Sequence, residues 1–535
     1  MSPAPGTVLR TVRHLRPRQV LHQLLDSVRG PLRPAPPPAP PPVWALERPT
    51  APFPGAPSHA RLQGPARVEL LNRSHDFGER IDWELAEEGP LFAFHLHQHD
   101  FLRAPELAPA LRARVLDDWI QRHRGGTGWH PANISLRALT WLKLLSSPAA
   151  LPDAARAGAL ASLAAQLDTL ARGLEIRLLA NHYLSNLLAL VAGGVALAGP
   201  CADAWRAHVP ALREQLDEQV LRDGAHFERS PMYHALMLEN VLDLLNWVRA
   251  GDRAPHGLEA QLTDVAARML GALAVYRHPD GEIALFADSA LGIAHAPGVL
   301  EAYAAALGVE ARGPERPGVL DAAGYVRLAA GPWSALVSVA GPAPAYQPGH
   351  AHADALSFEL CFEGTRLVTD SGVGEYVPGP RRDSARATRS HATIEVDGRD
   401  QAELWAAHRI GGRPRVSCAA ASPTRVEASC AGWATPDTVQ RRVLEMRAEA
   451  LEITDTLEGR PRPLRLVLPL APGLEPELRG SCARVASCRI QLPESARWRV
   501  EQAEAYPEFG RCEQRAVLVG EAEGAGPFVW SFRVL

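Results

Sequence analysis

The sequence predicts a multidomain protein of mixed α and β structure, with a helical N-terminal part and a C-terminal part of antiparallel strands. Three observations lead to this fold class. The chain has 535 residues, which is more than one hydrophobic core normally holds. Apolar residues recur at spacings of three and four between about residues 103 and 310, whereas after about residue 320 they recur at every second position.

Residues 1–50 are predicted to form a helix followed by a spacer. Leucines and valines between residues 8 and 29 follow helical spacing. The run from Arg33 to Val43 is rich in proline and is therefore expected to be extended. We interpret this run as a spacer, with a PxxP ligand for a partner domain as the alternative.

Residues 51–315 are predicted to form the helical domain. Segments rich in alanine and leucine follow one another here, with glycine and proline between them. Because no strand pattern interrupts residues 103–310, the succession indicates a solenoid or a toroid rather than a four-helix bundle. The expected helices include Leu111 to Arg124, Ser135 to Leu145, Ala154 to Gly173, His182 to Leu197 and Tyr233 to Arg249.

Residues 316–535 are predicted to form the β domain. Between Ala355 and Thr369 apolar residues alternate with polar ones, and Glu363-Gly364 marks a turn. Turn residues recur at intervals typical of a sandwich. Further strands are expected at Ile394 to Val396, Leu464 to Leu470 and Ala516 to Val519.

Composition excludes several classes of protein. The net charge of −4 and a pI near 6.6 do not favour a nucleic-acid binder. No apolar run reaches the roughly 20 residues that span a bilayer. The seven cysteines are odd in number and form no CxxC pair, which favours a reducing compartment. The first residues do not follow the pattern of a secretory signal, so we expect a cytoplasmic protein, or a periplasmic one if a leader is missing.

Two segments of the helical domain gather residue types that acid–base chemistry uses. The first is Asn181-His182-Tyr183 at the start of an expected helix, where asparagine is also a common cap. The second runs from Asp223 to His234. Its Ser230-Pro231 pair marks a helix start, so Tyr233 falls in the first helical turn. A network of capping side chains is the structural alternative for both.

A third segment, Gly349–Asp354, leads into the alternating strand of the β domain. Since residues two apart in a strand share a face, His350 and His352 are expected to project together. With Asp370 and His391 at nearby strand ends, two histidines and one aspartate suit a Zn²⁺ site with an open or water-filled fourth position. A hydrogen-bonded polar turn is the alternative.

Taken in order, these motifs resemble the heparinase II/III-like polysaccharide lyases, a class that includes oligo-alginate lyases. Segments 94–97 and 129–137 resemble the members found in bacterial polysaccharide gene clusters, which implies a role in an exopolysaccharide or capsule pathway. The segments that carry the main resemblance are Asn181-His182-Tyr183, Glu228–His234, Phe286–Ser289, His350–Asp354, Thr369–Gly372, Arg389–Ile394 and Val396–Gly398.

The resemblance implies an (α/α) toroid followed by an antiparallel β-sandwich, with the active cleft between them. It implies cleavage of a uronate-containing, anionic polysaccharide by β-elimination. Asn181 and His182 would bind and neutralise the uronate carboxylate, and Tyr233 and His350 would transfer the protons. Which of these two residues is the base stays open at this point, and an oligomer is compatible with the sequence.

The resemblance also implies a zinc ion with a structural role, held by His352, Asp370 and His391. The chain departs from the family pattern at Ala287, where glycine is common, and at Ala392, where asparagine usually follows the histidine. An arginine-rich segment, residues 381–389, is expected to receive the anionic chain, with a solvated loop as the alternative. The expected substrate-binding residues are Arg229, His234, Tyr376, Arg386 and Arg389.

Two other functions remain open from the sequence. One is a zinc-dependent glycan hydrolase with metal-bound water as nucleophile. The other is a non-catalytic glycan-binding or assembly protein of the same fold. A glycoside hydrolase would need a pair of carboxylates, and Glu228, Glu239 and Asp288 have no evident partners. The set of Asn181, Tyr233 and His350 favours an enzyme, because a binding module needs no base.

Overall fold

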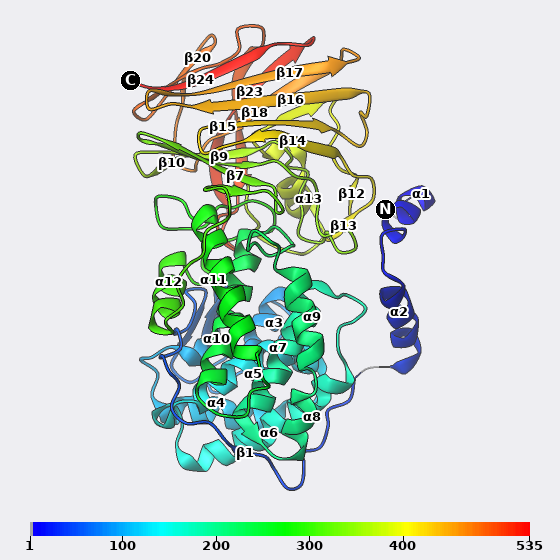
Figure 1. Cartoon of the computed structure of the whole chain (residues 1–535), viewed down its shortest axis with the longest axis vertical. Helices are drawn as coiled ribbons and strands as arrows, with labels where there is room; N and C mark the ends of the chain where they lie inside the picture. The colour runs from blue at the N-terminus through cyan, green and yellow to red at the C-terminus, as the bar shows by residue number, and fades with distance from the viewer. Residues whose placement is uncertain (1–3, 31) are drawn as a thin grey trace.

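The computed structural model describes residues 4–30 and 32–535, and it contains two bodies stacked along the long axis (Figure 1). Helices form the lower body, an (α/α) toroid, and antiparallel sheets form the upper one, a β-sandwich. The helices of the lower body are α3 (Pro90–Gln98), α4 (Pro109–Arg122), α5 (Pro131–Leu145), α6 (Asp153–Arg172), α7 (Ala180–Ala196), α8 (Pro200–Arg206), α9 (Val209–Gln219), α10 (Pro231–Arg249), α11 (Leu258–Tyr276) and α12 (Pro297–Ala306), with short 3₁₀ helices at Asp100–Arg103, Gly126–Trp129 and Pro148–Ala150.

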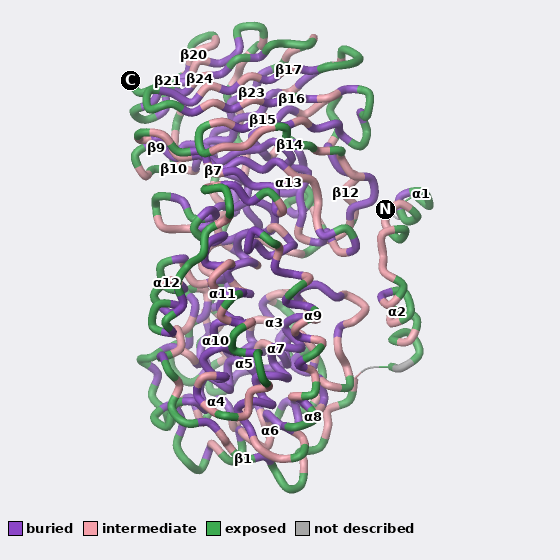
Figure 2. The backbone as a smooth tube through the Cα atoms, in the orientation of Figure 1, coloured by how far each residue is buried: buried purple, intermediate pink, exposed green. Residues whose placement is uncertain are grey.

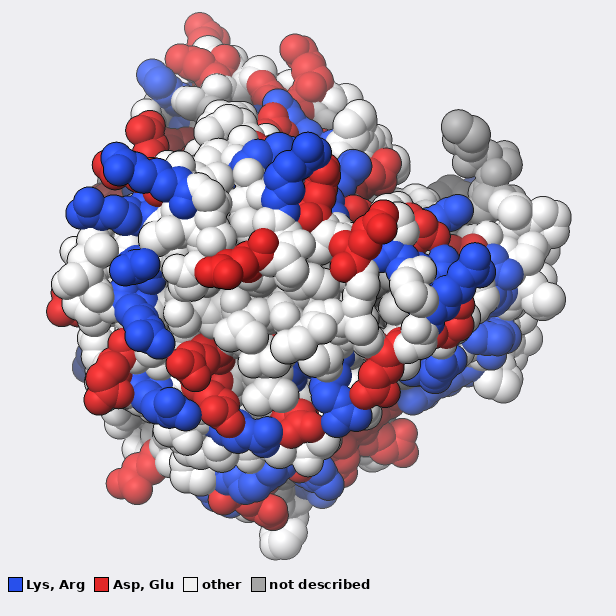
Figure 3. Space-filling view, turned by 90° about the horizontal axis from the view of Figure 1, so that it is seen from above, with Lys and Arg blue, Asp and Glu red and all other residues white. Residues whose placement is uncertain are grey.

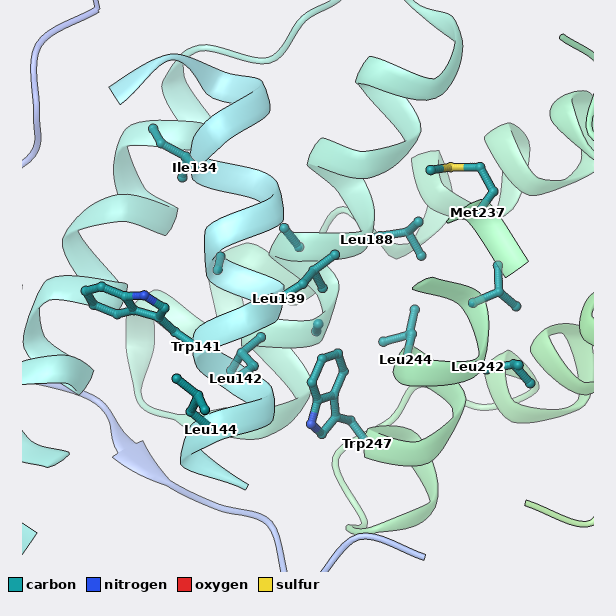
Figure 4. Packing of buried hydrophobic residues seen from close by; sticks show 14 of the residues in the cluster. Ile134, Leu139, Trp141, Leu142, Leu144, Leu188, Met237, Leu242, Leu244 and Trp247 are labelled. Carbon is teal, nitrogen blue, oxygen red and sulfur yellow. The ribbon is translucent and has the colours of Figure 1, made fainter. Parts of the chain in front are cut away.

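Helix α7 forms the centre of the toroid. It packs against α5, α6, α8, α9 and α10, and it is buried along nearly its whole length. Its apolar residues run continuously rather than on one stripe, as expected for a helix covered on all sides. Figure 4 shows Leu139 of α5 and Trp247 of α10 on the side of α5 that faces Leu188 of α7, whereas Trp141 points to the other side of α5. The helices predicted from residue 111 to residue 249 are confirmed.

The core of the toroid also contains Lys143, the single lysine of the chain. Its ammonium group lies 2.9 Å from Glu239 Oε1 and 2.5 Å from Asp243 Oδ2. Arg103 adds a second cation 2.6 Å from Glu239. Buried charges need partners of opposite sign, so these four residues neutralise one another inside the ring.

The N-terminal part differs from the prediction in two ways. The expected helix of residues 8–29 is divided into α1 (Pro5–Val12) and α2 (Pro17–Arg29), because a proline at position 17 holds Arg16 in an extended conformation. The proline-rich run, described from residue 32 on, forms no helix or strand and leads to β1 (Val43–Trp44), which pairs with β5 (Leu197–Ala198). A small sheet that the sequence did not predict follows: β2 (Ala60–Gln63), β3 (Arg67–Leu70) and β4 (Arg73–Asp76).

Three antiparallel sheets contribute to the core of the upper body, and all of its ladders are antiparallel. The largest sheet has eight strands in the order β14-β15-β16-β17-β24-β21-β20-β19. The second has four strands in the order β11-β18-β23-β22, and the third has five in the order β10-β9-β8-β7-β6. The strands are β6 (Val319–Leu320), β7 (Tyr325–Ala330), β8 (Trp333–Ser338), β9 (Phe358–Phe362), β10 (Thr365–Val368), β11 (Ile394–Val396), β14 (Arg415–Ala421), β15 (Arg425–Ala431), β16 (Thr438–Met446), β17 (Ala450–Gly459), β18 (Pro463–Pro469), β19 (Glu477–Arg479), β20 (Cys482–Val485), β21 (Cys488–Gln491), β22 (Arg497–Ala505), β23 (Glu513–Glu523) and β24 (Phe528–Val534).

The five-stranded sheet is the layer through which the two bodies meet. The predicted alternating strand is present as the hairpin β9–β10, but both faces of β9 are buried. The polar residue Glu359 points toward the toroid, where it lies 2.7 Å from His278 Nε2 and accepts a hydrogen bond from Leu285 N. The polar residue Glu359 on this strand therefore marks a contact between domains and not a solvent-facing surface.

The segment from His350 to Ser357 is irregular, since β9 begins at Phe358. His350 and His352 therefore do not lie on a strand, but their side chains do project together, because each contacts one oxygen of the Asp288 carboxylate. Loops and short elements complete the region between the bodies: β12 (Leu404–Trp405), β13 (Arg409–Ile410), helix α13 (Pro380–Arg386) and a 3₁₀ turn at Thr388–Ser390.

Two further features are the distribution of charge on the surface and the state of the cysteines. Figure 3, which looks onto the sandwich end, shows basic and acidic side chains interspersed over that face. All seven cysteines are unpaired. Among the described residues, no helix combines the length and the hydropathy needed to cross a membrane.

Removing one partner of a buried ion pair in the sandwich is expected to destabilise the protein strongly. The Arg442 guanidinium contacts both carboxylate oxygens of Asp455 at 2.8 and 2.9 Å and also donates to the carbonyls of Leu356 and Ala392. Because removal of one partner leaves a buried charge uncompensated, Asp455→Asn should lower the free energy of unfolding by about 3–5 kcal/mol. Chemical denaturation followed by circular dichroism measures this loss.

The matched control is Glu521→Gln, which removes an exposed partner of Arg497 and Arg499. Exposed pairs of this kind contribute roughly 0–1 kcal/mol, so the control should change stability little. Equal losses for the two variants would contradict the assignment.

Candidate active site

The site lies where the first turns of α7 and α10 face the loops of the five-stranded sheet. Tyr233 occupies the first turn of α10, whose start is fixed by Pro231 and by the cap Ser230. The Ser230 hydroxyl accepts a hydrogen bond from Tyr233 N at 3.2 Å and donates one to the carbonyl oxygen of Asp288 at 2.8 Å. The helix cap therefore ties the tyrosine to the loop that carries Asp288.

Tyr233, His350 and Tyr376 form one aromatic group. The rings of Tyr233 and His350 are stacked with centroids 3.9 Å apart, and the hydroxyls of Tyr233 and Tyr376 lie 3.1 Å apart. Burial raises the pKa of both tyrosines above the ordinary value for a phenol. Both hydroxyls are therefore protonated near neutral pH, and one can donate to the other.

Asp288 is the central carboxylate of the site. Its Oδ2 lies 2.9 Å from His350 Nδ1, its Oδ1 lies 2.9 Å from His352 Nε2, and Arg382 contacts both oxygens. Burial alone would raise the pKa of Asp288, but Arg382 outweighs this effect and the pKa lies well below its usual range. An ionised Asp288 only accepts hydrogen bonds, so His350 carries its proton on Nδ1 and leaves Nε2 free.

Backbone strain accompanies this arrangement. Ala287 has a φ of 57°, in the left-handed region that favours glycine. This geometry explains why glycine suits the position immediately before Asp288. Leu179 and Ala180 have φ values of 59° and 51° directly before Asn181. Strain of this kind concentrates at functional sites, where surrounding structure holds it in place.

Asn181 and His182 lie at the first turn of α7. The backbone N–H of Asn181 donates to Glu228 Oε1 at 2.9 Å, and His182 Nδ1 lies 3.1 Å from Glu175 Oε1. Burial lowers the pKa of His182, but the Glu175 carboxylate outweighs this effect and the pKa is raised. The arrangement favours an imidazolium at His182, and about a third of its side chain is exposed.

Glu228 lies on the side of His350 opposite to Asp288. Its Oε2 is 3.7 Å from His350 Nε2 and has no hydrogen-bond partner among the described residues. Burial raises the pKa of this carboxyl. His350 thus lies between an ionised carboxylate at Nδ1 and a carboxyl of raised pKa near Nε2.

The three residues expected to bind a metal come together in a buried cluster. Donor atoms of His352, Asp370 and His391 all lie within 4.8 Å of one another. His391 Nδ1 is 2.8 Å from Asp370 Oδ2, and burial lowers the pKa of His352 to about 4. The other ring nitrogens, His352 Nδ1 and His391 Nε2, are buried and have no hydrogen-bond partner among the described residues. Two unpartnered nitrogens beside a carboxylate match the donors that Zn²⁺ prefers.

Asp288, His350 and His408 form a second group of possible metal ligands. Asp288 is already neutralised there by the Arg382 guanidinium, so this group is less suited to a cation. His408 was not predicted, because a single histidine in a loop carries no sequence signal. Burial lowers its pKa to about 4.

Of the five predicted substrate-binding residues, Tyr376 belongs to the aromatic group and the other four lie outside it. His234 is buried, accepting from His226 N and contacting the carbonyl of Met269, so its assignment to substrate is wrong. The Arg386 assignment is also wrong, because its buried guanidinium donates to backbone carbonyls at positions 406 and 407. Arg229 donates to the carbonyls at positions 322 and 341 and so joins the two bodies. Arg389 is exposed in the 3₁₀ turn.

The arginine-rich segment 381–389 is therefore not one solvent-facing surface. Arg382 is buried against Asp288, and the exposed Arg381 lies 3.5 Å from Glu504. An open pocket beside them is lined by Arg73, Gly374, Glu375, Arg381, Arg382, Ala385, Tyr506, Gly510, Arg511 and Cys512. Three of these arginines, at positions 73, 381 and 511, are about half exposed.

Comparison with solved structures shows the fold. Heparinase III matches with a TM-score of 0.63 and 16% sequence identity, over 87% of this chain and 80% of that chain. A second heparinase III structure gives a TM-score of 0.60 at 16% identity, over 86% and 82% of the two chains. A mutant of the heparan sulfate lyase HepC from Pedobacter heparinus gives 0.58 at 18% identity, over 86% and 79%.

A curated relative is FtsZ-localized protein C of Caulobacter vibrioides (strain NA1000 / CB15N), 28% identical over 363 residues. The match covers 65% of this chain and spans 60% of that relative's length. Family models match both bodies: Heparinase II/III N-terminus over residues 108–306, and Heparinase II/III-like, C-terminal, over residues 312–525. Together these models cover more than half of the chain, which therefore belongs to the heparinase II/III-like family.

Proposed function

We propose that this protein is a polysaccharide lyase that cleaves a uronate-containing, anionic polysaccharide by β-elimination. The observation that carries the proposal is the stacking of Tyr233 on His350 with Asp288 bound to the far nitrogen of that histidine. A protonated phenol and an oriented imidazole thus lie next to each other between the two bodies. The matched solved structures include a protein described as a heparan sulfate lyase, which supports the same reaction class.

Elimination at a 4-linked uronate requires a base for the C5 proton and an acid for the departing oxygen. His350 has the properties of the base, since its free Nε2 can accept the proton and the ionised Asp288 stabilises the resulting imidazolium. Tyr233 has the properties of the acid, because burial keeps its hydroxyl protonated. The hydroxyl of Tyr376 can donate to the phenolate left on Tyr233.

The carboxylate of the substrate must also be neutralised, because charge grows on it as the C5 proton leaves. In this proposal the Asn181 amide donates a hydrogen bond to that carboxylate, and His182 supplies a positive charge. Glu175 supports this role by raising the pKa of His182. Donors fixed before the reaction stabilise such charge without reorganisation, as in an oxyanion hole.

The arginine-lined pocket supports an anionic substrate. Arg73, Arg381 and Arg511 line this pocket together with Tyr506 and with Arg382, whose guanidinium binds Asp288 of the site. Guanidinium forks bind carboxylate and sulfate oxygens in pairs. We assign this pocket to a neighbouring sugar of the polysaccharide. We also propose that the reaction belongs to a bacterial exopolysaccharide or capsule pathway, because segments 94–97 and 129–137 resemble family members found in such gene clusters.

Zinc is proposed at His352, Asp370 and His391, where it would fix the loops that flank His350. All three side chains are buried, so a metal held there would have no open face toward a substrate. This burial favours a structural role over the metal-bound water of a hydrolase. His352 links the cluster to the reacting groups through Asp288.

Replacing the tyrosine tests the elimination. Tyr233→Phe should lower turnover by at least about 10²-fold while the fold persists, because a general acid contributes roughly 10²–10⁴ in rate. The assay is new ultraviolet absorbance from the unsaturated product on a panel of uronate polysaccharides. His350→Ala should cause a similar loss, and the double variant should lose far less than the product of the two effects.

Tyr276→Phe is the matched control, because the buried hydroxyl of Tyr276 has no partner among the described residues. It should leave turnover unchanged. Incorporation of ¹⁸O from labelled water at the cleaved bond would show hydrolysis and overturn the lyase proposal.

The metal is tested by elemental analysis of the purified protein, with one zinc per chain as the expected result. His391→Ala should lose the metal and lower the melting temperature, since the remaining buried ligands would be left unpaired. His408→Ala should keep the metal, because His408 belongs to the other group of ligands. Absence of stoichiometric metal, with no change in melting temperature for His391→Ala, would disprove the site.

A further inference from the structure

The two N-terminal helices present an apolar surface to solvent. Leu9 of α1 is 70% exposed, and Leu21, Leu24 and Val28 of α2 are 55%, 64% and 79% exposed. The helices lie along the side of the molecule next to the junction of the two bodies (Figure 1), and exposure continues along them (Figure 2). Single exposed leucines are ordinary, but a contiguous set of them marks an interaction surface.

The apolar residues form one face of each helix, and all of them are exposed except Leu15 of the connecting turn and Leu25, which are half-buried. At 100° per residue, Val20, Leu21, Leu24, Leu25 and Val28 fall within an arc of about 140° on α2. Val8, Leu9 and Val12 fall within about 100° on α1. We call this set of eight residues the apolar face. The pattern is that of an amphipathic helix whose apolar side is not covered by the rest of the chain.

The opposite, polar side of the helices attaches to the protein. On α1, Thr7 and Arg10 bind the carboxylate of Glu403 in the upper body. The indole of Trp405 donates to Thr11 at 3.0 Å.

The second helix makes equivalent contacts, with the toroid and with Tyr346 of the upper body. The buried Gln19 donates to the carbonyl of Leu178, and Arg16 pairs with Glu218 and lies 4.0 Å from the ring centroid of Tyr346. A helix in a folded protein usually buries its apolar stripe and exposes its polar one. Here the orientation is reversed, so the apolar face is available to a partner outside the chain.

The charge of the segment indicates which partner fits. Between residues 4 and 33 there is one acidic residue, Asp26, which lies 3.5 Å from Arg177 of the toroid. The six arginines of the segment are at positions 10, 13, 16, 18, 29 and 33. The whole chain has a net charge of −4, so this segment is strongly basic on an otherwise acidic protein. Helices with an apolar face and arginine at its border lie in the surface of anionic bilayers.

We propose that the apolar face of α1 and α2 lies on the surface of a lipid bilayer containing anionic lipids. The leucines and valines would enter the boundary between headgroups and acyl chains, and the arginines that are not held by Glu403 or Glu218, such as Arg13 and Arg33, would contact lipid phosphates. A second copy of the chain fits less well, because pairing two such segments would bring these arginines together without acidic partners. The proposal is independent of the reaction that the protein catalyses.

The test uses the full chain and two kinds of vesicle, phosphatidylcholine alone and an equal mixture of phosphatidylcholine and phosphatidylglycerol. The protein should sediment with the mixed vesicles, bind less as salt rises, and bind little to phosphatidylcholine alone. Leu21→Asp/Leu24→Asp should weaken binding by more than about tenfold, since two apolar side chains lose their burial. Circular dichroism should show an unchanged melting curve.

Val299→Asp/Val529→Asp is the matched control, because both valines are exposed on the body of the protein at 42% and 48%. It should bind vesicles as the unchanged protein does. Equal binding by the Leu21/Leu24 variant, or no binding of the unchanged protein to mixed vesicles, would overturn the proposal. A dimer in sedimentation velocity that the Leu21/Leu24 variant dissociates, without vesicle binding, would assign the face to a second copy instead.

Discussion

The carboxylate of Asp288 is the interaction on which the geometry of the site depends. It receives His350 at one oxygen and His352 at the other, and Arg382 balances its charge. Its backbone carbonyl accepts from the cap of α10, so the same residue fixes the position of the helix that carries Tyr233. One buried anion therefore joins the toroid, the proposed zinc cluster and the proton-transfer group. Displacement of reacting groups by about 1 Å can be costly in rate, and this network opposes such displacement.

Much of the fold could be predicted from residue periodicity. The helices of the toroid were predicted because apolar residues recur at helical spacing, and proline at the first turn marks the start of most of them. The break at Pro17 and the small sheet of residues 60–76 were missed, since short elements contribute too few residues to show a period. In β9 the alternation predicted a strand but not its surroundings. Glu359 looks like a solvent-facing residue in the sequence, yet it is buried against the toroid.

Only part of the site could be predicted from the sequence. The metal cluster could be expected because its three residues belong to motifs at strand ends, and the structure brings them together. The role of Asp288 could not be predicted, because its partners come from segments some 60 and 90 residues away. Arg386 was misjudged for a related reason. Its partners are backbone carbonyls of a distant loop, and the identity of a residue says nothing about carbonyls that approach it in space.

The burial of Lys143 has a consequence for the surface of the protein. Since Lys143 is the single lysine and lies inside the toroid, every cationic side chain on the exterior that is charged above pH 8 is a guanidinium. Guanidinium groups keep their proton to a pKa above about 12, so alkaline solutions do not discharge this surface. Reagents that acylate or crosslink lysine amines should find no accessible side chain, and tryptic fragments of the exterior should all end at arginine.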